Sequence, residues 1–226
     1  MIYLSRIQDK YFRGKCKGVL VMDFGKLIEK RRSANNFMKG VAITEQELKP
    51  IFNDVKLAPS AFNLQHTEYI TVLNPDVKEQ LYEAADRQYK VHSASAAIIV
   101  TSDRYAYKQT KRLNEGLKNL GVIDDWQLEQ MVKDNALYHE ERGEEFLKAE
   151  AIRNASLSAM LFMLAAKNRG WDTCPMTGFD QQRVREILHI PSTHEIVLMI
   201  TIGKEKEESR HLRGYRKPVN EFVTFV

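Results

Sequence analysis

The sequence predicts one α+β domain in which β-strands lie among longer helices around a shared core. Short runs rich in β-branched and apolar residues alternate with longer segments of helical periodicity. Neither an internal repeat nor a low-complexity linker divides the chain. A length of 226 residues with a 43% hydrophobic fraction is enough to bury a substantial core. The expected domain spans residues 22–226, and a basic leader, residues 1–21, precedes it.

The first two expected elements are helices with recognisable starts. Asp23 can cap a short helix whose apolar residues recur at helical spacing over 24–28, and the polar run RRSANN, residues 31–36, ends it as a loop. Thr44 and Glu47 have the spacing of a capping box in front of a second apolar stripe. A proline inside this second helix should kink it or delay its regular part.

The middle of the chain predicts two strands and a helix between them. A structured loop at 58–63 leads into TEYITVL, residues 67–73, which has the composition of a strand. Asn74 followed by Pro75 marks the start of a third helix. The run AAIIVTS, residues 96–102, is almost entirely apolar, which predicts a strand in a sheet covered on both faces.

The following segments are predicted to be helical. Residues 103–150 are strongly charged with patchy helical periodicity, so we expect helices with an exposed face and breaks at Gly116, Gly121 and Gly143. Residues 154–170 are apolar nearly all round, which predicts a central buried helix that Gly170 ends.

The last third predicts a turn, a helix and a strand. After the expected turn at 171–179, Asp180 can cap a short helix that ends before Pro191. The run EIVLMITIG, residues 195–203, is a third buried strand, and the tail that follows is expected to end in a β-rich piece.

Charge and cysteine content exclude several function classes. The net charge of +4 lies entirely in the leader, since residues 1–21 hold five basic residues and one acid. The rest of the chain is formally neutral, so a nucleic-acid partner is not expected. No apolar run reaches the ~18–20 residues of a membrane span, and charges interrupt any secretory h-region. The leader is therefore expected to be disordered or an upstream-start extension. Cys16 and Cys174 form no disulfide framework, which favours the cytoplasm.

Familiar catalytic and metal-binding motifs are absent. The sequence holds no P-loop, G-x-G-x-x-G, G-x-S-x-G, H-E-x-x-H or C-x-x-C. His139 and Glu140 begin like a zinc helix, but Gly143 stands where the second histidine is needed. The motif GKCKG at 14–18 has nucleophile-elbow spacing without the strand and helix that such an elbow requires. We therefore predict neither a metal site nor a side-chain catalyst.

Four polar, loop-prone stretches lie next to predicted buried elements. An arginine beside a hydroxyl group can bind a phosphate, and Ser, Asn or Gln on a tight loop can hydrogen-bond the edge of a heterocycle. Taken singly, each stretch is better explained as a solvated helix end or a turn. The stretches are RRSAN (31–35), APSAFNLQ (58–65), PMTG (175–178) and YRKP (215–218).

Taken together and in their order along the chain, these stretches and the segments next to them resemble the nitroreductase family of flavin mononucleotide (FMN) dependent oxidoreductases. The resemblance covers residue 22 to the C-terminus, and it is strongest to NAD(P)H nitroreductases of bacilli, which share a turn similar to GWDTCPMTGF. The matching motifs are RRS, APSAFNLQH, NASLSAMLFMLAAKNRGWDTC, PMTGFD, and VLMITIGK followed by YRKP.

The resemblance implies a nitroreductase-like fold with a central, mainly antiparallel sheet surrounded by helices. It further implies an intertwined homodimer that binds two FMN molecules at the subunit interface. Arg31, Ser33 and Arg216 match the phosphate and ribityl contacts of the family, and Arg32 contributes mainly backbone. A second set matches the loop and the turn along the flavin ring: Pro59, Ser60, Ala61, Asn63, Gln65, Thr177 and Gly178.

Two departures from the family pattern concern cations. Family members commonly carry a lysine or arginine where Asn35 stands, and that cation stabilises the reduced flavin. Lys90, or else Arg87, falls near a second contact with the pyrimidine edge and could compensate. A late lysine of the family is replaced here by Gly214, with Arg213 displaced by one position.

The activity implied by the resemblance is ping-pong electron transfer. NADH or NADPH passes hydride to flavin N5, and a nitroaromatic, quinone or free flavin then accepts it. Because the flavin carries this chemistry, no catalytic side chain is expected, and residues 103–150 are expected to form the wall that selects the acceptor. Alternatives are another flavin reaction, such as dehalogenation or ring oxidation, or a flavin-binding redox partner without rapid turnover.

Overall fold

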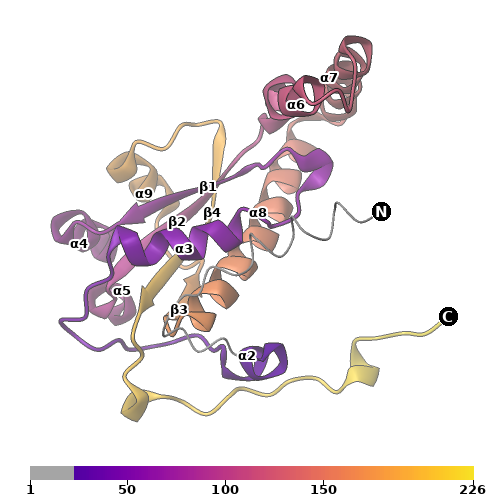
Figure 1. The fold of residues 1–226 in the computed structure, drawn as a ribbon. Helices are drawn as coiled ribbons and strands as arrows, with labels where there is room; N and C mark the ends of the chain where they lie inside the picture. The colour runs from indigo at the N-terminus through magenta and orange to yellow at the C-terminus, as the bar shows by residue number, and fades with distance from the viewer. Residues whose placement is uncertain (1–22) are drawn as a thin grey trace.

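A computed structural model describes residues 23–226, so the predicted leader and Cys16 lie outside the described residues. At its centre is a four-stranded sheet in the order β1-β2-β4-β3, in which every neighbouring pair is antiparallel (Figure 1). The strands are β1 (Thr67–Val72), β2 (Ala96–Asp103), β3 (Asp172–Met176) and β4 (His194–Gly203). The predicted α+β class with an antiparallel sheet is confirmed.

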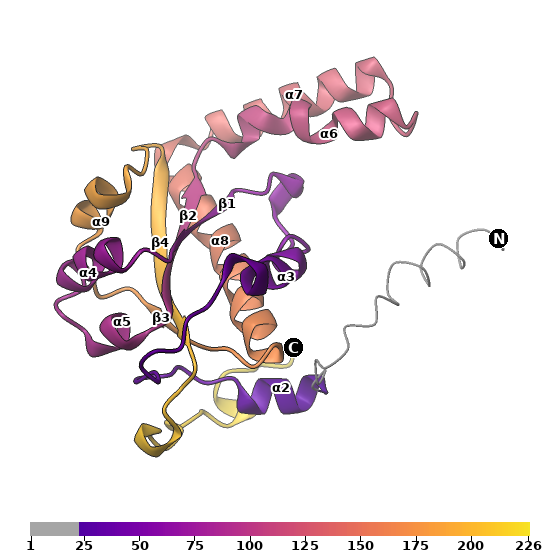
Figure 2. The same cartoon turned by 60° about the vertical axis from the view of Figure 1, so that its left-hand side comes forward.

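Helices cover both faces of this sheet (Figures 1 and 2). On one face, α3 (Glu45–Val55) and α8 (Gly143–Asn168) pack on a core that includes Ile98 and Val100 of β2. On the other, α4 (Pro75–Ala84), α5 (Tyr89–Ser93) and α9 (Gln181–Leu188) adjoin a core with the alternate residues Ala97 and Ile99. Both faces of β2 are therefore buried, as its apolar run predicted.

The other helices lie outside these layers. The short helix α2 (Phe24–Lys30) packs near α8, beside the C-terminal tail. The helices α6 (Thr110–Asn119) and α7 (Asp125–Glu140) pair with each other and project from one end of the sheet (Figure 2).

The predicted helix starts are confirmed by their caps. The Asp23 carboxylate accepts from the N–H groups of the first turn, and Thr44 and Glu47 form a reciprocal capping box. Asn74 and Asp180 cap α4 and α9 through their side chains. Each cap satisfies backbone donors that the helix itself leaves unpaired, which explains why these boundaries are encoded locally. The proline of the second helix lies within α3 and does not delay its start.

Two local predictions are wrong. Residues 172–176 of the expected turn 171–179 form β3, an edge strand whose one neighbouring strand in the described sheet is β4, and an edge position tolerates the missing N–H of Pro175. The tail, residues 204–226, contains short 3₁₀ turns and no terminal strand. Its apolar side chains are exposed, because no strand of the described chain lies beside them.

Two further corrections concern helices. Gly116 lies inside α6 rather than at a break, whereas Gly121 and Gly143 do end or begin helices with positive φ. The predicted central helix extends back to residue 143 and is not buried all round. Its apolar residues Ile152, Leu157 and Met160 are 37%, 53% and 41% exposed. No helix in residues 23–226 combines the length and apolarity that crossing a membrane would need.

Candidate functional site

The segment 31–35 lies along the edge of the sheet, beside β3. The Ala34 N–H donates to the Thr173 carbonyl at 3.0 Å, and Ser33 forms a parallel bridge with Thr173. The tail returns to this segment, since Arg213 donates to the carbonyls of Glu29 at 2.5 Å and Arg31 at 3.3 Å. Arg32 donates to the carbonyl of His211.

Together these segments enclose a cavity of ≈ 160 Å³, which we call the arginine pocket. Four residues predicted from the first stretch and Arg216 from the last meet here, although about 180 residues separate the two stretches in sequence. The pocket is lined by Arg31, Arg32, Ser33, Asn35, Glu205, Arg210, His211, Leu212, Arg213, Gly214 and Arg216.

The charges in the arginine pocket are unbalanced. Arg210 is paired with Glu205 at 2.7 Å and with Glu207 at 3.1 Å. Arg31, Arg213 and Arg216 form no ion pair with any residue in 23–226. Burial lowers the pKa of Arg31, and repulsion from Arg213 and Arg216 lowers it further. The carboxylate of Glu205, which also lines the pocket, is paired with Arg210, so three guanidinium groups share a small pocket without an acidic partner of their own. This arrangement suits a multivalent anion such as a phosphate.

Lys90 lies next to the arginine pocket. Burial raises the pKa of the Cys174 thiol, and the nearby cations Lys90 and Arg31 oppose that shift. The Cys174 side chain is therefore within electrostatic reach of both cations. Arg87 points elsewhere, because it is exposed and bonds both carboxylate oxygens of Glu83 at 3.0 Å. Of the two candidate compensating cations, Lys90 is the one that the structure leaves without an acidic partner among the described residues.

The turn that carries Thr177 and Gly178 is tied to the start of α5. The Gln88 Nε2 donates to the Gly178 carbonyl at 2.6 Å, two residues before Lys90. This hydrogen bond holds the predicted turn next to the segment that carries Lys90. The sequence did not indicate this role for Gln88, because a single glutamine gives no local signal.

The second predicted stretch forms a separate group, and we call its residues 60–65 loop 60–65. Pro59, Ser60 and Gln65 line a cavity of ≈ 260 Å³ together with Tyr69 and Ser158, which are hydrogen-bonded to each other at 2.7 Å. Desolvation by burial raises the pKa of Tyr69 to about 12, so its hydroxyl is protonated at neutral pH. Ala61 and Asn63 lie in the 3₁₀ turn of the same loop.

Loop 60–65 and the arginine pocket lie at different places along α8. The Ala61 N–H donates to Asn154 on α8 at 2.7 Å, and α8 runs 14 residues further before β3 begins beside segment 31–35. At 1.5 Å per residue this separation is about 21 Å, and the same arrangement is visible in Figures 1 and 2. One chain therefore presents two incomplete groups of predicted residues rather than one closed site.

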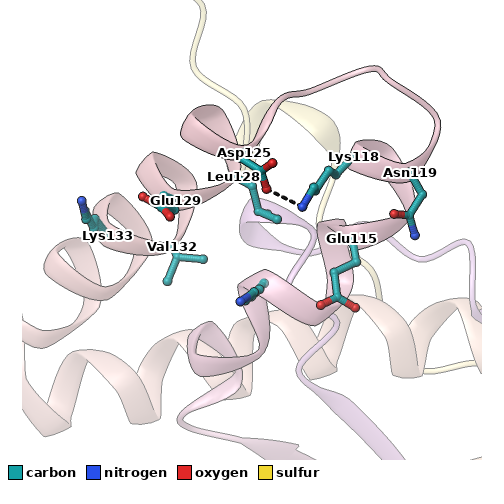
Figure 3. A pocket seen from close by; sticks show the side chains of 9 residues that line it. Glu115, Lys118, Asn119, Asp125, Leu128, Glu129, Val132 and Lys133 are labelled. Atoms are coloured by element: carbon teal, nitrogen blue, oxygen red, sulfur yellow. Dashed lines mark ion pairs between the residues drawn. The ribbon is translucent and has the colours of Figure 1, made fainter.

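A larger cavity of ≈ 530 Å³ lies between α6 and α7 (Figure 3). Leu128 and Val132 contribute apolar surface to it, and the rest of its lining, apart from one asparagine, is charged with both signs, including the Lys118–Asp125 ion pair. None of the predicted cofactor residues lines this cavity. It belongs to the helical segment expected to form the acceptor-selecting wall.

Histidines and acids of the described chain form no metal centre. Within residues 23–226, no group of three or more His, Cys, Asp or Glu side chains could hold a metal ion. His139 is 1% exposed, shares a hydrogen bond with the Asn135 carbonyl at 2.6 Å and stacks on Tyr107 with ring centroids 4.9 Å apart. Its role in the structure is therefore packing between α7 and the preceding segment.

Comparison with known proteins identifies relatives of the whole described region. The model of the nitroreductase family matches residues 28–204. A protein of Bacillus subtilis named "Putative NAD(P)H nitroreductase MhqN" is 57% identical over 204 residues, which are 90% of this chain and 99% of that protein. A "CLA biosynthesis enone reductase" of Lactiplantibacillus plantarum is 27% identical over 88% of this chain and 93% of its own.

Solved structures show the same fold. A crystal structure of the "putative nitroreductase ydfN" from Bacillus subtilis superposes with a TM-score of 0.88 at 57% identity, covering 90% of this chain and 98% of its own. A "putative nitroreductase" from Exiguobacterium sibiricum, solved in complex with FMN, has a TM-score of 0.84 at 25% identity and covers 91% of this chain and 98% of its own.

Proposed function

The chain belongs to the nitroreductase family, and we propose that it is an FMN-dependent oxidoreductase that carries electrons from NADH or NADPH to nitroaromatic, quinone or flavin acceptors. The family is one of oxidoreductases, and the relatives cited above include an NAD(P)H nitroreductase by name and an FMN complex. When bound, FMN would supply the hydride-accepting N5 for a ping-pong cycle, and the protein would supply position and electrostatic bias.

The observation that carries this proposal is the unpaired charge of the arginine pocket. Arg31, Arg213 and Arg216 lack acidic partners in residues 23–226, and burial, followed by repulsion from the other two arginines, lowers the pKa of Arg31. A phosphate monoester would neutralise this repulsion and accept charge-assisted hydrogen bonds. The cavity of ≈ 160 Å³ is below the roughly 300–1,000 Å³ of a pocket for a whole ligand. It suits the phosphate and the adjoining part of a ribityl chain.

The flavin ring would extend from this pocket towards Lys90. This cation has no acidic partner in the described chain and lies beside Cys174, next to the tethered turn of Thr177 and Gly178. Lys90 would bias the ring's pyrimidine edge towards the reduced anion in place of the neutral Asn35. The Gln88 bond to the Gly178 carbonyl would keep the turn's backbone against the ring.

Loop 60–65 would complete the site from a second copy of the chain. It is bonded to Asn154, about 21 Å along α8 from the helix end that leads to β3 and segment 31–35, so we expect that it does not close over the same flavin. The helix α8 exposes the apolar side chains of Ile152, Leu157 and Met160. The tail adds exposed aromatic side chains, including Tyr215 and Phe222. These exposed apolar side chains favour an intertwined homodimer in which each flavin contacts both chains.

The experiment that tests the proposal is the anaerobic reduction of the purified protein. We expect a yellow protein that releases FMN on denaturation, bleaches with NADH or NADPH, and recovers its colour with menadione or nitrofurazone. A colourless protein that FMN cannot reconstitute would refute the proposal. Bleaching without turnover by any acceptor would instead support a flavin-binding redox partner.

A second reaction class has one specific observation in its favour. The relative from Lactiplantibacillus plantarum is named as an enone reductase, so this fold also occurs in an enzyme named for a different substrate class. Steady-state NAD(P)H oxidation, measured with an enone, with menadione and with nitrofurazone as acceptor, distinguishes an enone reductase from a nitroaromatic or quinone reductase. Turnover of the enone alone would replace nitroaromatics and quinones as the proposed acceptors.

A further inference from the structure

Loop 60–65 holds an unfavourable backbone conformation. Phe62, Asn63 and Gln65 have φ values of 52°, 54° and 51°, in the left-handed region. Asparagine visits this region readily, but for other non-glycine residues it is an unfavourable conformation. Phe62 is also 51% exposed, so burial of its ring does not fully offset that cost. Contacts from outside the loop must therefore hold this conformation.

The main polar contact from outside the loop is Asn154. This residue is on α8 and only 4% exposed, and its Oδ1 accepts the Ala61 N–H at 2.7 Å. Its Nδ2 donates to the Glu150 carbonyl, one turn back, at 2.8 Å, which orients the amide so that the oxygen faces the loop. Among residues 23–226 this is the only hydrogen bond from loop 60–65 to another element.

The remaining contacts are weaker or internal. The Ser60 Oγ accepts the Gln65 N–H at 3.0 Å, which closes the loop on itself without fixing its place on the protein. The Phe62 ring meets Tyr138 and His139 of α7 edge to face, with centroids 5.0 and 5.7 Å apart. These ring contacts position one side of the loop against α7, whereas Asn154 holds its backbone against α8.

We propose that Asn154 is a positioning residue for flavin binding, because its side-chain oxygen holds loop 60–65 in the strained conformation that faces the cofactor. This inference rests on the proposed FMN site. A strained loop detaches readily when one tether is lost, and the apparent affinity for FMN then falls in proportion to the fraction of molecules whose loop is still in place. Asn154 itself would contact no part of the flavin.

Three variants separate the two hydrogen bonds of Asn154. Asn154→Ala removes both the acceptor for Ala61 and the donor to Glu150. Asn154→Asp keeps the acceptor, removes the donor and adds a negative charge at this buried position. Asn114→Ala is the matched control, since buried Asn114 on α6 makes the same kind of bond to a carbonyl one turn back, at 2.8 Å, and bonds nothing in loop 60–65.

The first measurement is amide hydrogen exchange of residues 58–66 in the flavin-free protein, at a pH where the introduced carboxylate is ionised. We expect at least tenfold faster exchange at the Ala61 amide in Asn154→Ala, with near wild-type exchange in Asn154→Asp and Asn114→Ala. Unchanged exchange in Asn154→Ala, or equally fast exchange in both Asn154 variants, would overturn the tether.

The second measurement is the FMN dissociation constant, from fluorescence quenching. We expect it to rise about tenfold in Asn154→Ala and to stay within threefold of wild type in Asn154→Asp and Asn114→Ala. An unchanged constant in Asn154→Ala with accelerated exchange would overturn the positioning role. Failure of the wild-type protein to bind FMN would refute the proposed function instead, and hydrogen exchange would still decide whether Asn154 holds the loop. If Asn154→Ala does not fold, loss of FMN affinity in folded Asn154→Asp would overturn the inference.

Discussion

Replacing Arg31 by methionine should affect the flavin-free and flavin-bound protein in opposite directions. Methionine keeps most of the apolar stem and removes the guanidinium. In the flavin-free protein Arg31 has no acidic partner in residues 23–226 and is repelled by Arg213 and Arg216. Removing it therefore breaks no ion pair and relieves that repulsion. In the FMN complex the same change removes a charge-assisted bond to the phosphate.

The magnitudes follow from these contacts. A hydrogen bond to a charged group is worth about 1.5–3 kcal/mol, which corresponds to a roughly 10- to 150-fold weaker affinity for FMN. Stability of the flavin-free protein should stay within about 0.5 kcal/mol of wild type or rise, as for other changes that break no buried contact. Salt should weaken FMN binding less in Arg31→Met than in wild type, because fewer charges remain to be screened.

The assay is fluorescence titration of flavin-free protein with FMN at low and high salt, with thermal unfolding in parallel. Arg183→Met is the control, since Arg183 is an exposed arginine on α9 outside every predicted site. An FMN dissociation constant within threefold of wild type would refute the phosphate role of Arg31. A large loss of stability without FMN would refute the claim that its charge is uncompensated.

Three further changes test the fold and the assembly. Leu157→Glu replaces an exposed apolar side chain of α8 by a charge and should yield a monomer in light scattering with weakened FMN binding; an unchanged dimer would contradict the proposed interface. In Gly203→Ala the new Cβ would lie 2.7 Å from Phe37, so urea unfolding should show a free energy of unfolding lower by about 1–3 kcal/mol. Gly116→Ala, which has open space in α6, should raise the free energy of unfolding by up to about 1 kcal/mol. Burial lowers the pKa of His66 to about 4, so the unfolded chain binds a proton between pH 4 and 6.5 that the folded chain does not, and stability should fall as pH drops through this window. His66→Gln should remove on the order of 3 kcal/mol of that loss, and an identical pH dependence in both proteins would contradict the assignment.

Elements with a local physical signal were predictable from the sequence. The caps at Thr44, Asn74 and Asp180 satisfy donors within three residues, so their sequence pattern is sufficient. The strand β3 was not predictable in this way, because its only partner is β4 and it contains Pro175. The strand predicted at the end of the tail was wrong for the opposite reason, because its β-prone residues find no partner strand within the described chain.

The candidate site shows the same division between residues that have a local sequence signal and residues that do not. Motifs identified the residues of segment 31–35, loop 60–65 and the turn at 177–178, yet the contacts that hold them come from remote positions. Asn154 tethers the loop across 93 residues of sequence, and Gln88 tethers the turn across 90. Neither residue type has a strong local preference that would reveal such a role. The basic run RHLRGYRK at 210–217 was the one available signal for the additional arginines of the pocket.

The separation of the two groups along α8 has a thermodynamic consequence for the proposed enzyme. If the arginine pocket of one chain and loop 60–65 of another bind the same flavin, FMN binds the dimer more tightly than the monomer, and linkage requires FMN to stabilise the dimer by the same factor. The strained loop strengthens this coupling, because an isolated chain would leave it with fewer contacts to hold Phe62 in its left-handed conformation. The dimer dissociation constant should therefore fall when FMN is added, and it should fall less in Arg31→Met. An FMN-independent dimer constant, measured by analytical ultracentrifugation at several protein concentrations, would show that one chain binds the whole cofactor by itself.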